Sequence, residues 1–575
     1  MDSISWRLKR TYKCGELRSK DAGKEVILNG WVHSIRKVGR VIFILLRDRS
    51  GIVQVVVTPK SQAFPAAKEL DREFVIAVKG EVRLRPKNQV NPDMPTGEIE
   101  VAAHEIEVLN ESKPLPLPIW DESLMSTTSE ANRLRYRYLD LRREKVKNNI
   151  LLRAKVVKAM RDFYTSKGFI EVETPYLGRS TPEGARDFLV PSRLHPRKFY
   201  ALTQSPQLFK QLLMVAGLEK YFQVARCFRD EDPRADRQPE FTQFDMEISF
   251  VTREDVMSVV EESMKYVFRE VLNIDLPTPF PRFTYEEAIE RFGTDKPDLR
   301  FPSELHTLLE DGRLYLRYFK MKGLGKMCGT LQSKLKEAAK NFSLKGYGFR
   351  AVDLGSKECS EAMGVLPEDV KGVELEEGEG VVFAYGDFAT ASQFLGVLRN
   401  ALGREAGIVK RNQYSFVWVT DFPLFEVDEE TGRLISKHHP FTSPRPEDIP
   451  LLDKEPLKVK ALSYDLVLNG YEVAGGSIRI HKRWLQEKMF SLMGLSKEEM
   501  IDRYGFLLEA LEFGAPPHGG IAFGLDRLVA VMAGEDSIRD VIAFPKNKEM
   551  ADPMTGSPAE APPEYLKDLT WLKLT

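Results

Sequence analysis

The stretch from Ala225 to Phe250 constrains this chain more than any other, because it places many charged side chains between two apolar flanks. The flanks, 221–228 and 241–250, alternate like strands of a partly buried sheet. The charged middle cannot form a core, so it predicts a loop that joins two antiparallel strands. The polar residues of this hairpin are Arg229, Glu231, Arg234, Arg237, Gln238, Glu240, Asp245 and Glu247. An arginine fork suits phosphate or carboxylate, although a salt-bridged surface hairpin is the simpler alternative.

The first 110 residues predict a small β-barrel. Five β-rich runs separated by short turns cover 25–37, 41–48, 52–58, 73–85 and 97–109. Five short strands with a basic, aromatic-bearing face are typical of an OB-fold, a common binder of single-stranded nucleic acid. This region holds 19 Lys/Arg and 14 Asp/Glu, a local charge of +5 in a chain of net charge −1. Arg36, Phe43 and Gln54 are candidates for contacts to phosphate, base face and base edge, but Phe43 lies in an apolar run and fits a core position equally well.

The rest of the chain predicts an α+β multidomain protein, with roughly three or four domains in all. A proline-rich connector at 111–123, within a hinge at 111–140, leads into a long helix over 134–168. The apolar stripe of that helix comprises Leu152, Val156, Met160 and Phe163, and Gly168 ends it. The strand expected at 169–177 contains Pro175, which cannot donate to a sheet ladder. We therefore expect it at a sheet edge or a subunit contact.

Residues 286–412 differ from their surroundings, because they hold no comparable cluster of charged site residues. A strand at 380–388 followed by a helix at 389–404 predicts a compact inserted α+β domain. The insertion would separate two parts of one larger domain, 141–285 and 413–575, the second with a C-terminal extension.

Cysteine usage and hydropathy bound the setting of the protein. The chain has four cysteines that lie far apart and form no C-x-x-C pair: Cys14, Cys227, Cys328 and Cys359. This spacing argues against structural zinc and against a disulfide framework, and it fits a reducing compartment. No run approaches the ~18 apolar residues of a membrane span. We therefore expect a cytoplasmic protein without a membrane segment.

Two further elements carry polar residues typical of a binding site. HGGIAFGLDRLVAVMAG (518–534) predicts a strand that runs into a helix with Arg527 in its first turn, where glycines admit a flat ligand and the helix start favours anions. In LNGYEVAGGSIRIH (468–481), Glu472 and Arg479 are seven apart and would lie on opposite faces of a strand. A bulge near Ala474 would let both reach one cleft. Asp465 lies on the preceding strand.

Together with the Pro175 strand, these elements resemble the three motifs of the class II aminoacyl-tRNA synthetases. The Pro175 strand resembles the first motif, which lies at the dimer interface of that family, FRDED (228–232) the second, and GGIAFGLDR (519–527) the third. The OB-fold narrows the resemblance to the aspartyl, asparaginyl and lysyl subgroup. QSPQLFKQ (204–211), RDEDPRADRQPEFTQFD (229–245), HHPFT (438–442) and the large insertion resemble the bacterial-type aspartyl-tRNA synthetases, over essentially the whole chain. The expected fold is an OB-fold at 1–110 and a class II antiparallel-sheet catalytic domain that carries the inserted α+β domain.

The resemblance implies ATP-dependent ligation of L-aspartate to the 3′ end of tRNA-Asp through an aspartyl-adenylate. Arg229 and Arg527 would be the catalytic residues, on the α-phosphate and at the γ-phosphate. Phe241 would stack on the adenine, with Glu231 and Gln238 on the same side. Asp465 and Glu472 would hold Mg²⁺. The implied ATP-binding set is Arg229, Asp230, Glu231, Gln238, Phe241, Glu472, Gly524, Leu525, Asp526 and Arg527.

The resemblance also implies how aspartate and tRNA are bound. Lys210 and Arg479 would clamp the side-chain carboxylate, which the neutral amide of asparagine could not replace. Glu183, Ser205 and Gln207 are expected around the α-amino group, with His438 and His439 beside the substrate. The implied aspartate-binding set is Glu183, Ser205, Gln207, Lys210, Arg229, Asp245, His438, His439 and Arg479, and the implied anticodon-binding set is Arg36, Phe43 and Gln54. Partners would be tRNA-Asp, L-aspartate and a second copy of the chain in a homodimer.

Several alternatives stay open on sequence grounds. The nearest is a non-discriminating enzyme that charges both tRNA-Asp and tRNA-Asn, which in the family depends on barrel residues near Val38 and Lys87; a lysine at 87 leans towards discrimination. An asparaginyl enzyme would leave Lys210 and Arg479 buried and unpaired. A non-catalytic RNA-binding paralogue would be expected to lack Arg229, Glu472 or Arg527. An ammonia-using asparagine synthetase would have no use for the barrel.

Overall fold

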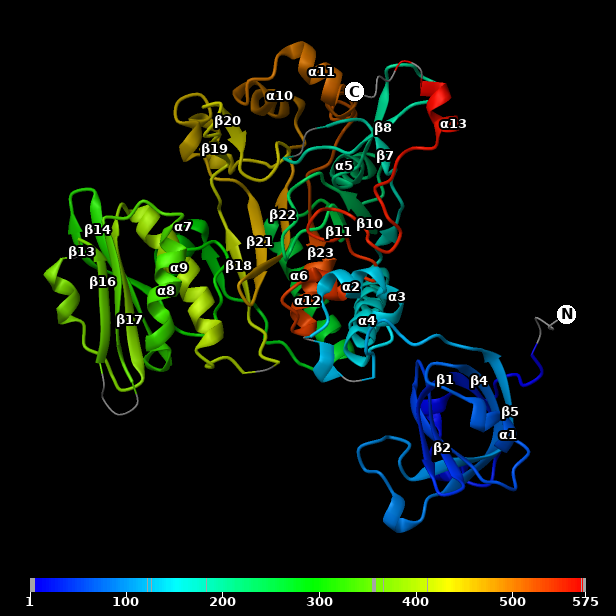
Figure 1. Cartoon of the computed structure of the whole chain (residues 1–575). Helices are drawn as coiled ribbons and strands as arrows, with labels where there is room; N and C mark the ends of the chain where they lie inside the picture. The colour runs from blue at the N-terminus through cyan, green and yellow to red at the C-terminus, as the bar shows by residue number, and fades with distance from the viewer. Residues whose placement is uncertain are drawn as a thin grey trace. The chain divides into compact units, whose positions relative to one another are not determined.

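The structure is a computed structural model that describes residues 6–120, 122–125, 127–181, 184–353, 358–365, 367–410, 412–569 and 571. The chain divides into two compact units, Met1–Arg143 and Glu144–Thr575 (Figure 1). Among the described residues, no helix combines the length and the apolar character needed to cross a membrane.

The N-terminal unit is built on a closed five-stranded barrel with the order β1-β2-β3-β5-β4. The strands are β1 (Glu25–Val38), β2 (Val41–Asp48), β3 (Gly51–Val57), β4 (Val75–Leu84) and β5 (Ile99–Asn110), and the short helix α1 (Phe64–Glu69) follows β3. Alternate residues such as Val26, Ile44 and Val55 fill the interior, because side chains along a strand point to opposite faces. The barrel confirms the predicted OB-fold, and its strands begin and end within two residues of the predicted runs.

The helix predicted over 134–168 is interrupted. The structure has α2 (Glu130–Arg135), α3 (Arg137–Asp140) and α4 (Glu144–Ser166) instead of one continuous helix. Asp140 is fully buried at the end of α3, where Arg133, Arg137 and Arg143 all pair with its carboxylate. The local sequence favours one continuous helix, but the pairing of three arginines with one buried carboxylate favours a break at this point.

The C-terminal unit centres on an eight-stranded sheet in the order β12-β18-β21-β22-β23-β11-β10-β6. Its strands are β6 (Ile170–Glu171), β10 (Lys220–Phe228), β11 (Glu240–Ser249), β12 (Arg282–Thr284), β18 (Phe416–Thr420), β21 (Ser463–Leu468), β22 (Tyr471–Ile478) and β23 (His518–Gly524). The edge strands β6 and β12 pair parallel to their neighbours, and the inner pairs are antiparallel. The charged hairpin is thus β10 and β11. Of the strand predicted at 169–177, only Ile170–Glu171 pairs at the edge of this sheet, as β6, and Pro175 lies in a segment without strand structure that follows it.

Three helices cover one face of this sheet and form the main core with it. They are α4, α6 (Arg253–Leu272) and α12 (Leu525–Ala533) (Figure 1). Val156, Met160 and Phe163 of the predicted stripe are buried there, and Leu152 packs at its border. The opposite face of the sheet is therefore left free to carry polar residues.

Smaller elements surround this framework. A three-stranded sheet combines β7 (Leu177–Gly178), β9 (Phe199–Leu202) and β8 (Leu189–Pro191), and β19 (Phe425–Val427) pairs with β20 (Leu434–Ser436). Further helices outside this core are α5 (Gln207–Val215), α7 (Tyr285–Phe292), α10 (Arg483–Leu492), α11 (Lys497–Ala510) and α13 (Pro563–Leu566).

The inserted domain has its own antiparallel sheet in the order β13-β14-β17-β15-β16. Its elements are β13 (Leu305–Asp311), β14 (Leu314–Lys322), α8 (Cys328–Ala339), β15 (Gly346–Val352), β16 (Glu358–Gly364), β17 (Glu379–Gly386) and α9 (Phe388–Glu405). Figure 1 shows α9 and α8 between this sheet and the rest of the unit. Cys328 and Cys359 form a disulfide between α8 and β16, which the spacing of the cysteines did not predict, because only the packing of α8 brings them together.

Candidate functional site

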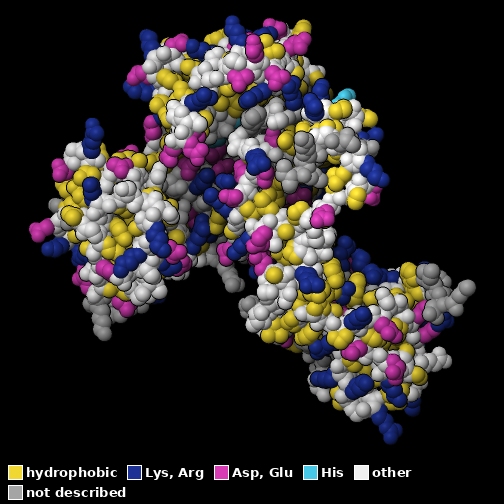
Figure 2. Space-filling view, turned by 45° about the horizontal axis from the view of Figure 1, so that its top comes forward, with side chains coloured by type: hydrophobic (Ala, Val, Ile, Leu, Met, Phe, Trp, Pro, Cys, Tyr) yellow, Lys and Arg dark blue, Asp and Glu magenta, His cyan; other side chains and the backbone are white. Residues whose placement is uncertain are grey.

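The candidate site lies on the sheet face opposite the helical core. Along β11, Phe244, Met246 and Ile248 join the core, so alternation turns Gln243, Asp245 and Glu247 to the other face. Neighbouring β23 presents glycine and alanine on that side, which leaves space above the strands. Figure 2 shows acidic and basic side chains gathered in a hollow of this unit beside the inserted domain.

A cavity of about 260 Å³ opens on this face. Its lining includes eight of the residues predicted for aspartate binding: Ser205, Gln207, Lys210, Arg229, Asp245, His438, His439 and Arg479. The ninth, Glu183, lies outside the described residues. Residues from five separate stretches of the sequence therefore meet in one cavity.

A bulge brings Glu472 and Arg479 into the same cavity. In the β21–β22 ladder, Leu466 pairs with Ala474 but Val467 pairs with Glu472, so Val473 is an extra residue. The extra residue reverses the alternation between Glu472 and Arg479. The predicted bulge is confirmed, and both side chains line the cavity.

Two buried cations are held by two buried carboxylates. Arg479 and Lys210 are each 1% exposed. Arg479 donates to both oxygens of Glu247, at 2.9 and 3.2 Å. Lys210 Nζ lies 3.0 Å from Asp245 Oδ1 and 3.4 Å from Glu247 Oε2. The second oxygen of Asp245, Oδ2, is buried without a hydrogen-bond partner, so the cavity offers an acceptor for an ammonium group.

The environment shifts the pKa values of this cluster in different directions. Burial raises the pKa of Asp245, and Lys210 only partly opposes it. Burial would also raise the pKa of Glu247, but Arg479 and Lys210 outweigh it and the pKa is lowered. Burial and the charge of Arg479 hold the pKa of His439 well below its usual value. The neutral His439 ring can therefore accept a hydrogen bond from Arg479 Nη1, which lies 2.7 Å from its Nε2.

A second carboxylate pair borders the same cavity. A Cβ placed on Gly475 would lie 3.0 Å from Asp465 Oδ1 and 3.6 Å from Glu472 Oε1, so the two carboxylates converge on the space above that glycine. His438 Nε2 lies 3.4 Å from Asp465 Oδ1, and Lys296 Nζ lies 3.0 Å from Glu472 Oε2. Burial alone would lower the pKa of His438, but Asp465 raises it.

The chemistry of this pair fits Mg²⁺. Burial raises the pKa of Asp465, with the nearby charge of Glu472 adding to the effect, whereas Lys296 outweighs burial at Glu472 and the pKa of Glu472 is lowered. Asp465 Oδ1 is buried, and its ion-pair partner is the His438 ring at 3.4 Å. Among the described residues, no three His, Cys, Asp or Glu side chains gather as a metal site. Two carboxylates completed by phosphate oxygens and water are a common arrangement for Mg²⁺.

A second cavity of about 430 Å³ adjoins the first. Arg229, Gln243, Glu472, Gly475 and Ala522 line both cavities. The guanidinium of Arg229 lies 5.0 Å from the ring centroid of Phe241, and its Nε is buried without a hydrogen-bond partner. An arginine with an unused donor thus stands where the two cavities meet.

The other cations of the second cavity already have partners. Arg527 donates to the carbonyl of Glu472 at 2.6 Å and lies 3.1 Å from Asp236 Oδ2. Arg237 lies 3.1 Å from Glu231 Oε2. Arginines aimed into a cavity and paired with acids that a ligand can displace are suited to phosphate binding.

Most of the predicted ATP-binding residues line the second cavity. They are Arg229, Glu231, Gln238, Phe241, Glu472, Gly524, Asp526 and Arg527. Leu525 is not part of the lining, because its side chain is fully buried in the helical core. Asp230 instead pairs with Arg186 at 3.3 Å and is not part of the lining.

Two of the lining residues have a structural task as well. Gln238 donates to the carbonyl of Lys546 at 3.1 Å and accepts from its N–H at 2.8 Å, so its amide anchors the C-terminal segment. Asp526 accepts from the N–H of Thr242 at 2.8 Å and pairs with Arg153. Both therefore hold the walls of the cavity.

Among the charged and amide side chains that line this cavity, the sequence interpretation did not single out Asp236, Gln243 and Lys296. Gln243 was detectable from its alternation with Asp245 on the same strand. Asp236 lies in the charged loop but was not singled out. Lys296 falls inside the range 286–412, in which the sequence showed no comparable cluster of site residues, so it was not singled out.

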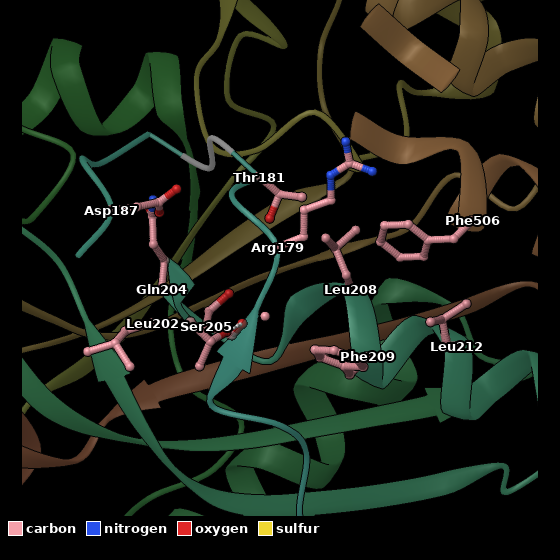
Figure 3. A pocket seen from close by; sticks show the side chains of 12 residues that line it. Arg179, Thr181, Asp187, Leu202, Gln204, Ser205, Leu208, Phe209, Leu212 and Phe506 are labelled. Carbon is pink, nitrogen blue, oxygen red and sulfur yellow. Dashed lines mark hydrogen bonds between the residues drawn. The ribbon is translucent and has the colours of Figure 1, made fainter. Parts of the chain in front are cut away.

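A third cavity, of about 240 Å³, lies on another side of α5 (Figure 3). Leu202, Leu208, Phe209, Leu212 and Phe506 form its apolar walls. Ser205 lines this cavity and the 260 Å³ cavity alike, and its Oγ accepts from the N–H of Gln207 at 3.3 Å at the start of α5. The helix that carries Lys210 is thus packed by apolar residues on one side and faces the polar cluster on the other.

The barrel presents the three predicted nucleic-acid contacts on its outer surface. Ile42 and Ile44 are buried while Phe43 is half-buried between them, which excludes the core alternative for Phe43. Arg36 pairs with Phe43 across the β1–β2 ladder, with its guanidinium 5.9 Å from the ring centroid. Gln54 donates to Glu100 at 3.0 Å. A partly exposed ring flanked by a cation is suited to stacking on a base.

Comparison with known families agrees with both units. Residues 129–548 match the family described as tRNA synthetases class II (D, K and N), and residues 26–109 match the OB-fold nucleic acid binding domain.

Whole-length relatives extend this agreement. The chain is 50% identical to the aspartate–tRNA(Asp/Asn) ligase of Caldanaerobacter subterraneus subsp. tengcongensis, over 98% of both chains. It is also 50% identical to the ligase of the same name from Moorella thermoacetica, over 98% of this chain and 96% of the relative. Among solved structures, asparaginyl-tRNA synthetase from Pyrococcus horikoshii shares the fold, with a TM-score of 0.62 and 24% identity over 94% of this chain and 98% of the other. The chain therefore belongs to the class II aminoacyl-tRNA synthetases and, within them, to the aspartate–tRNA ligase family.

Proposed function

We propose that the 260 Å³ cavity binds L-aspartate, that the 430 Å³ cavity binds ATP, and that the enzyme joins them as an aspartyl-adenylate before transfer to tRNA. The observation that carries this proposal is that the two cavities meet at Arg229. There, an α-carboxylate in one cavity and an α-phosphate in the other would both lie within reach of one guanidinium.

The reaction needs no protein nucleophile. An oxygen of the aspartate α-carboxylate attacks the α-phosphorus, the bond to the β-phosphate oxygen breaks, and pyrophosphate leaves with the electron pair. Arg229 offsets the charge that develops on the α-phosphate. Arg527, beside Glu472, holds the far end of the polyphosphate, and Phe241 offers a face to the adenine.

Selection of aspartate rests on Lys210 and Arg479. Asp245 and Glu247 already pair with these cations, so the expectation that asparagine would leave them unpaired does not hold. The side-chain carboxylate of aspartate adds charge-assisted hydrogen bonds to both cations, which the neutral amide of asparagine makes more weakly. Asp245 Oδ2, which has no hydrogen-bond partner, accepts from the α-ammonium group. Neutral His439 keeps Arg479 oriented.

Mg²⁺ would be held by Asp465 and Glu472, and when bound it supplies positive charge to the phosphates. In the structure, the Lys296 ammonium group is the cation that faces Glu472.

On the tRNA side, Phe43 would stack on an anticodon base, with Gln54 and Arg36 beside it. The primary tRNA is tRNA-Asp. A second candidate, charging of both tRNA-Asp and tRNA-Asn, is favoured by the names of the relatives, which include both tRNAs.

Charging of purified tRNA-Asp and tRNA-Asn transcripts with labelled aspartate tests both candidates. We expect aspartylation of tRNA-Asp. Comparable charging of tRNA-Asn would establish the broader activity, whereas an enzyme that charges neither transcript would contradict the proposal.

We also propose a homodimer formed through the first-motif region. Ile170, Leu177 and Leu189 are 48%, 51% and 55% exposed in the single chain, and the last two lie on the strands that flank β9. Exposed apolar residues that gather in this way mark contact surfaces. Light scattering of the purified protein should give twice the chain mass of 65.6 kDa. A monomer at micromolar concentration would contradict this.

A further inference from the structure

The inserted domain is linked to the ATP cavity by one lysine. Lys296 lies in the loop that follows α7 and leads into β13, and it lines the 430 Å³ cavity. Its Nζ lies 3.0 Å from Glu472 Oε2, while 41% of the side chain stays exposed. The ammonium group can therefore change partners without leaving the cavity.

Helix α9 of the inserted domain fixes the loop that carries Lys296. Asn400 donates to the carbonyl of Lys296 at 3.2 Å. Arg399, fully buried, donates to the carbonyls of Asp298 and Phe301, both at 3.0 Å. Further back, a Cβ on Gly396 would lie only 2.3 Å from the carbonyl oxygen of Gly293, so α9 packs directly against the end of α7.

The same helix holds the turn before Glu472. Arg404 donates to the hydroxyl of Tyr471 at 2.6 Å, and its guanidinium lies 4.4 Å from that ring. Gly470 has a φ of 80°, and a Cβ there would lie 3.1 Å from both Arg404 Nη2 and Asp298 Cβ. Both members of the Lys296–Glu472 pair are thus positioned by α9.

The pairing pattern of the cavity indicates what Lys296 does. Several cations of the cavity wall are each paired with a carboxylate. Arg527 lies 3.1 Å from Asp236, and Arg237 lies 3.1 Å from Glu231. Lys296 is paired with Glu472 in the same way, at 3.0 Å. An incoming polyphosphate carries several negative charges and competes with these carboxylates for their cations.

We propose that Lys296 is an ATP-binding residue that pairs with Glu472 in the empty site and with the polyphosphate in the loaded site, and that α9 of the inserted domain sets its position. This inference rests on the proposed function, because it needs ATP in the 430 Å³ cavity. It assigns the inserted domain a role in holding a substrate contact.

Isothermal titration of α,β-methylene-ATP, AMP and aspartate, each with MgCl₂ present, tests the proposal on Lys296→Met and Lys296→Arg. Loss of one charge-assisted contact should lower the affinity of Lys296→Met for α,β-methylene-ATP about tenfold or more, and Lys296→Arg should keep most of the wild-type affinity. AMP and aspartate should bind as in the wild type, because neither carries the polyphosphate. Lys340→Met, at the exposed end of α8, is the matched control and should change nothing.

A double-mutant cycle with Glu472→Gln separates a direct contact from an indirect one. If Lys296 contacts the polyphosphate, Lys296→Met still weakens binding in the Glu472→Gln background. If the loss disappears there, Lys296 acts only as the counter-charge of Glu472 and the proposal is wrong. Asn400→Ala should also lower the affinity for α,β-methylene-ATP, by a smaller factor than Lys296→Met does. Unchanged affinity in Asn400→Ala would overturn the role of α9. Absence of aspartate-dependent ATP–pyrophosphate exchange in the wild type would instead refute the proposed function.

Discussion

Replacement of Lys210 by methionine tests the charge balance of the aspartate cavity. At an effective dielectric of about 20, contacts at 3.0 Å to Asp245 and 3.4 Å to Glu247 are each worth roughly 5 kcal/mol of attraction before desolvation. Desolvation of the ammonium offsets much of this, and breaking such buried pairs costs about 3–5 kcal/mol of stability. The remaining carboxylates also repel the substrate, so KM for aspartate should rise about a hundredfold, equivalent to about 3 kcal/mol.

Aspartate-dependent ATP–pyrophosphate exchange gives KM, and urea unfolding reports the stability loss. Lys210→Met/Asp245→Asn should recover much of the unfolding midpoint, because one uncompensated carboxylate is gone, yet KM for aspartate should stay high. Lys220→Met, an exposed lysine on β10, serves as the control. If Lys210→Met binds aspartate with wild-type KM, Lys210 does not hold the substrate carboxylate and the assignment of this cavity fails.

Three further expectations follow from single residues. The pKa of His439 is depressed in the folded protein. The neutral ring therefore contributes to the free energy of unfolding above the unfolded-state pKa of about 6.5, and this contribution is lost as the pH falls through the folded-state pKa. NMR of the ring should show a neutral His439 at pH 6, and a charged ring there would refute this. Phe43→Ala should raise KM for tRNA about tenfold to a hundredfold while leaving adenylate formation unchanged; equal charging kinetics would contradict the stacking role. Gly520→Ala should destabilise the fold by about 2 kcal/mol or more, because a Cβ there would lie 2.0 Å from Glu247 Oε2; an unchanged urea midpoint would show that the strand accommodates it.

Regular alternation explains why the framework could be predicted. The five barrel strands and the hairpin of β10 and β11 follow from period-two patterns, and the same pattern turns Asp245 and Glu247 away from the core. The bulge at Val473 was expected because Glu472 and Arg479 otherwise point apart. The local sequence pattern was sufficient to predict which side of the sheet a residue lies on wherever that depends on one strand alone.

Contacts between distant segments could not be predicted in this way. Lys296 reaches Glu472 only because α9 packs on the loop after α7, which no local pattern encodes. Leu525 was assigned to ATP by its place in the motif, yet the first turn of α12 directs it into the core. The break near Asp140 depends on three arginines converging on one buried carboxylate.

The central claim is that Arg229 joins an aspartate cavity to an ATP cavity. The most direct measurement is aspartate-dependent ATP–pyrophosphate exchange by the wild type and by Arg229→Ala. The wild type should exchange with aspartate but not with asparagine, and Arg229→Ala should lose well over tenfold in adenylate formation, about 1.4 kcal/mol or more of transition-state stabilisation. Exchange that survives within about tenfold in Arg229→Ala would contradict the account.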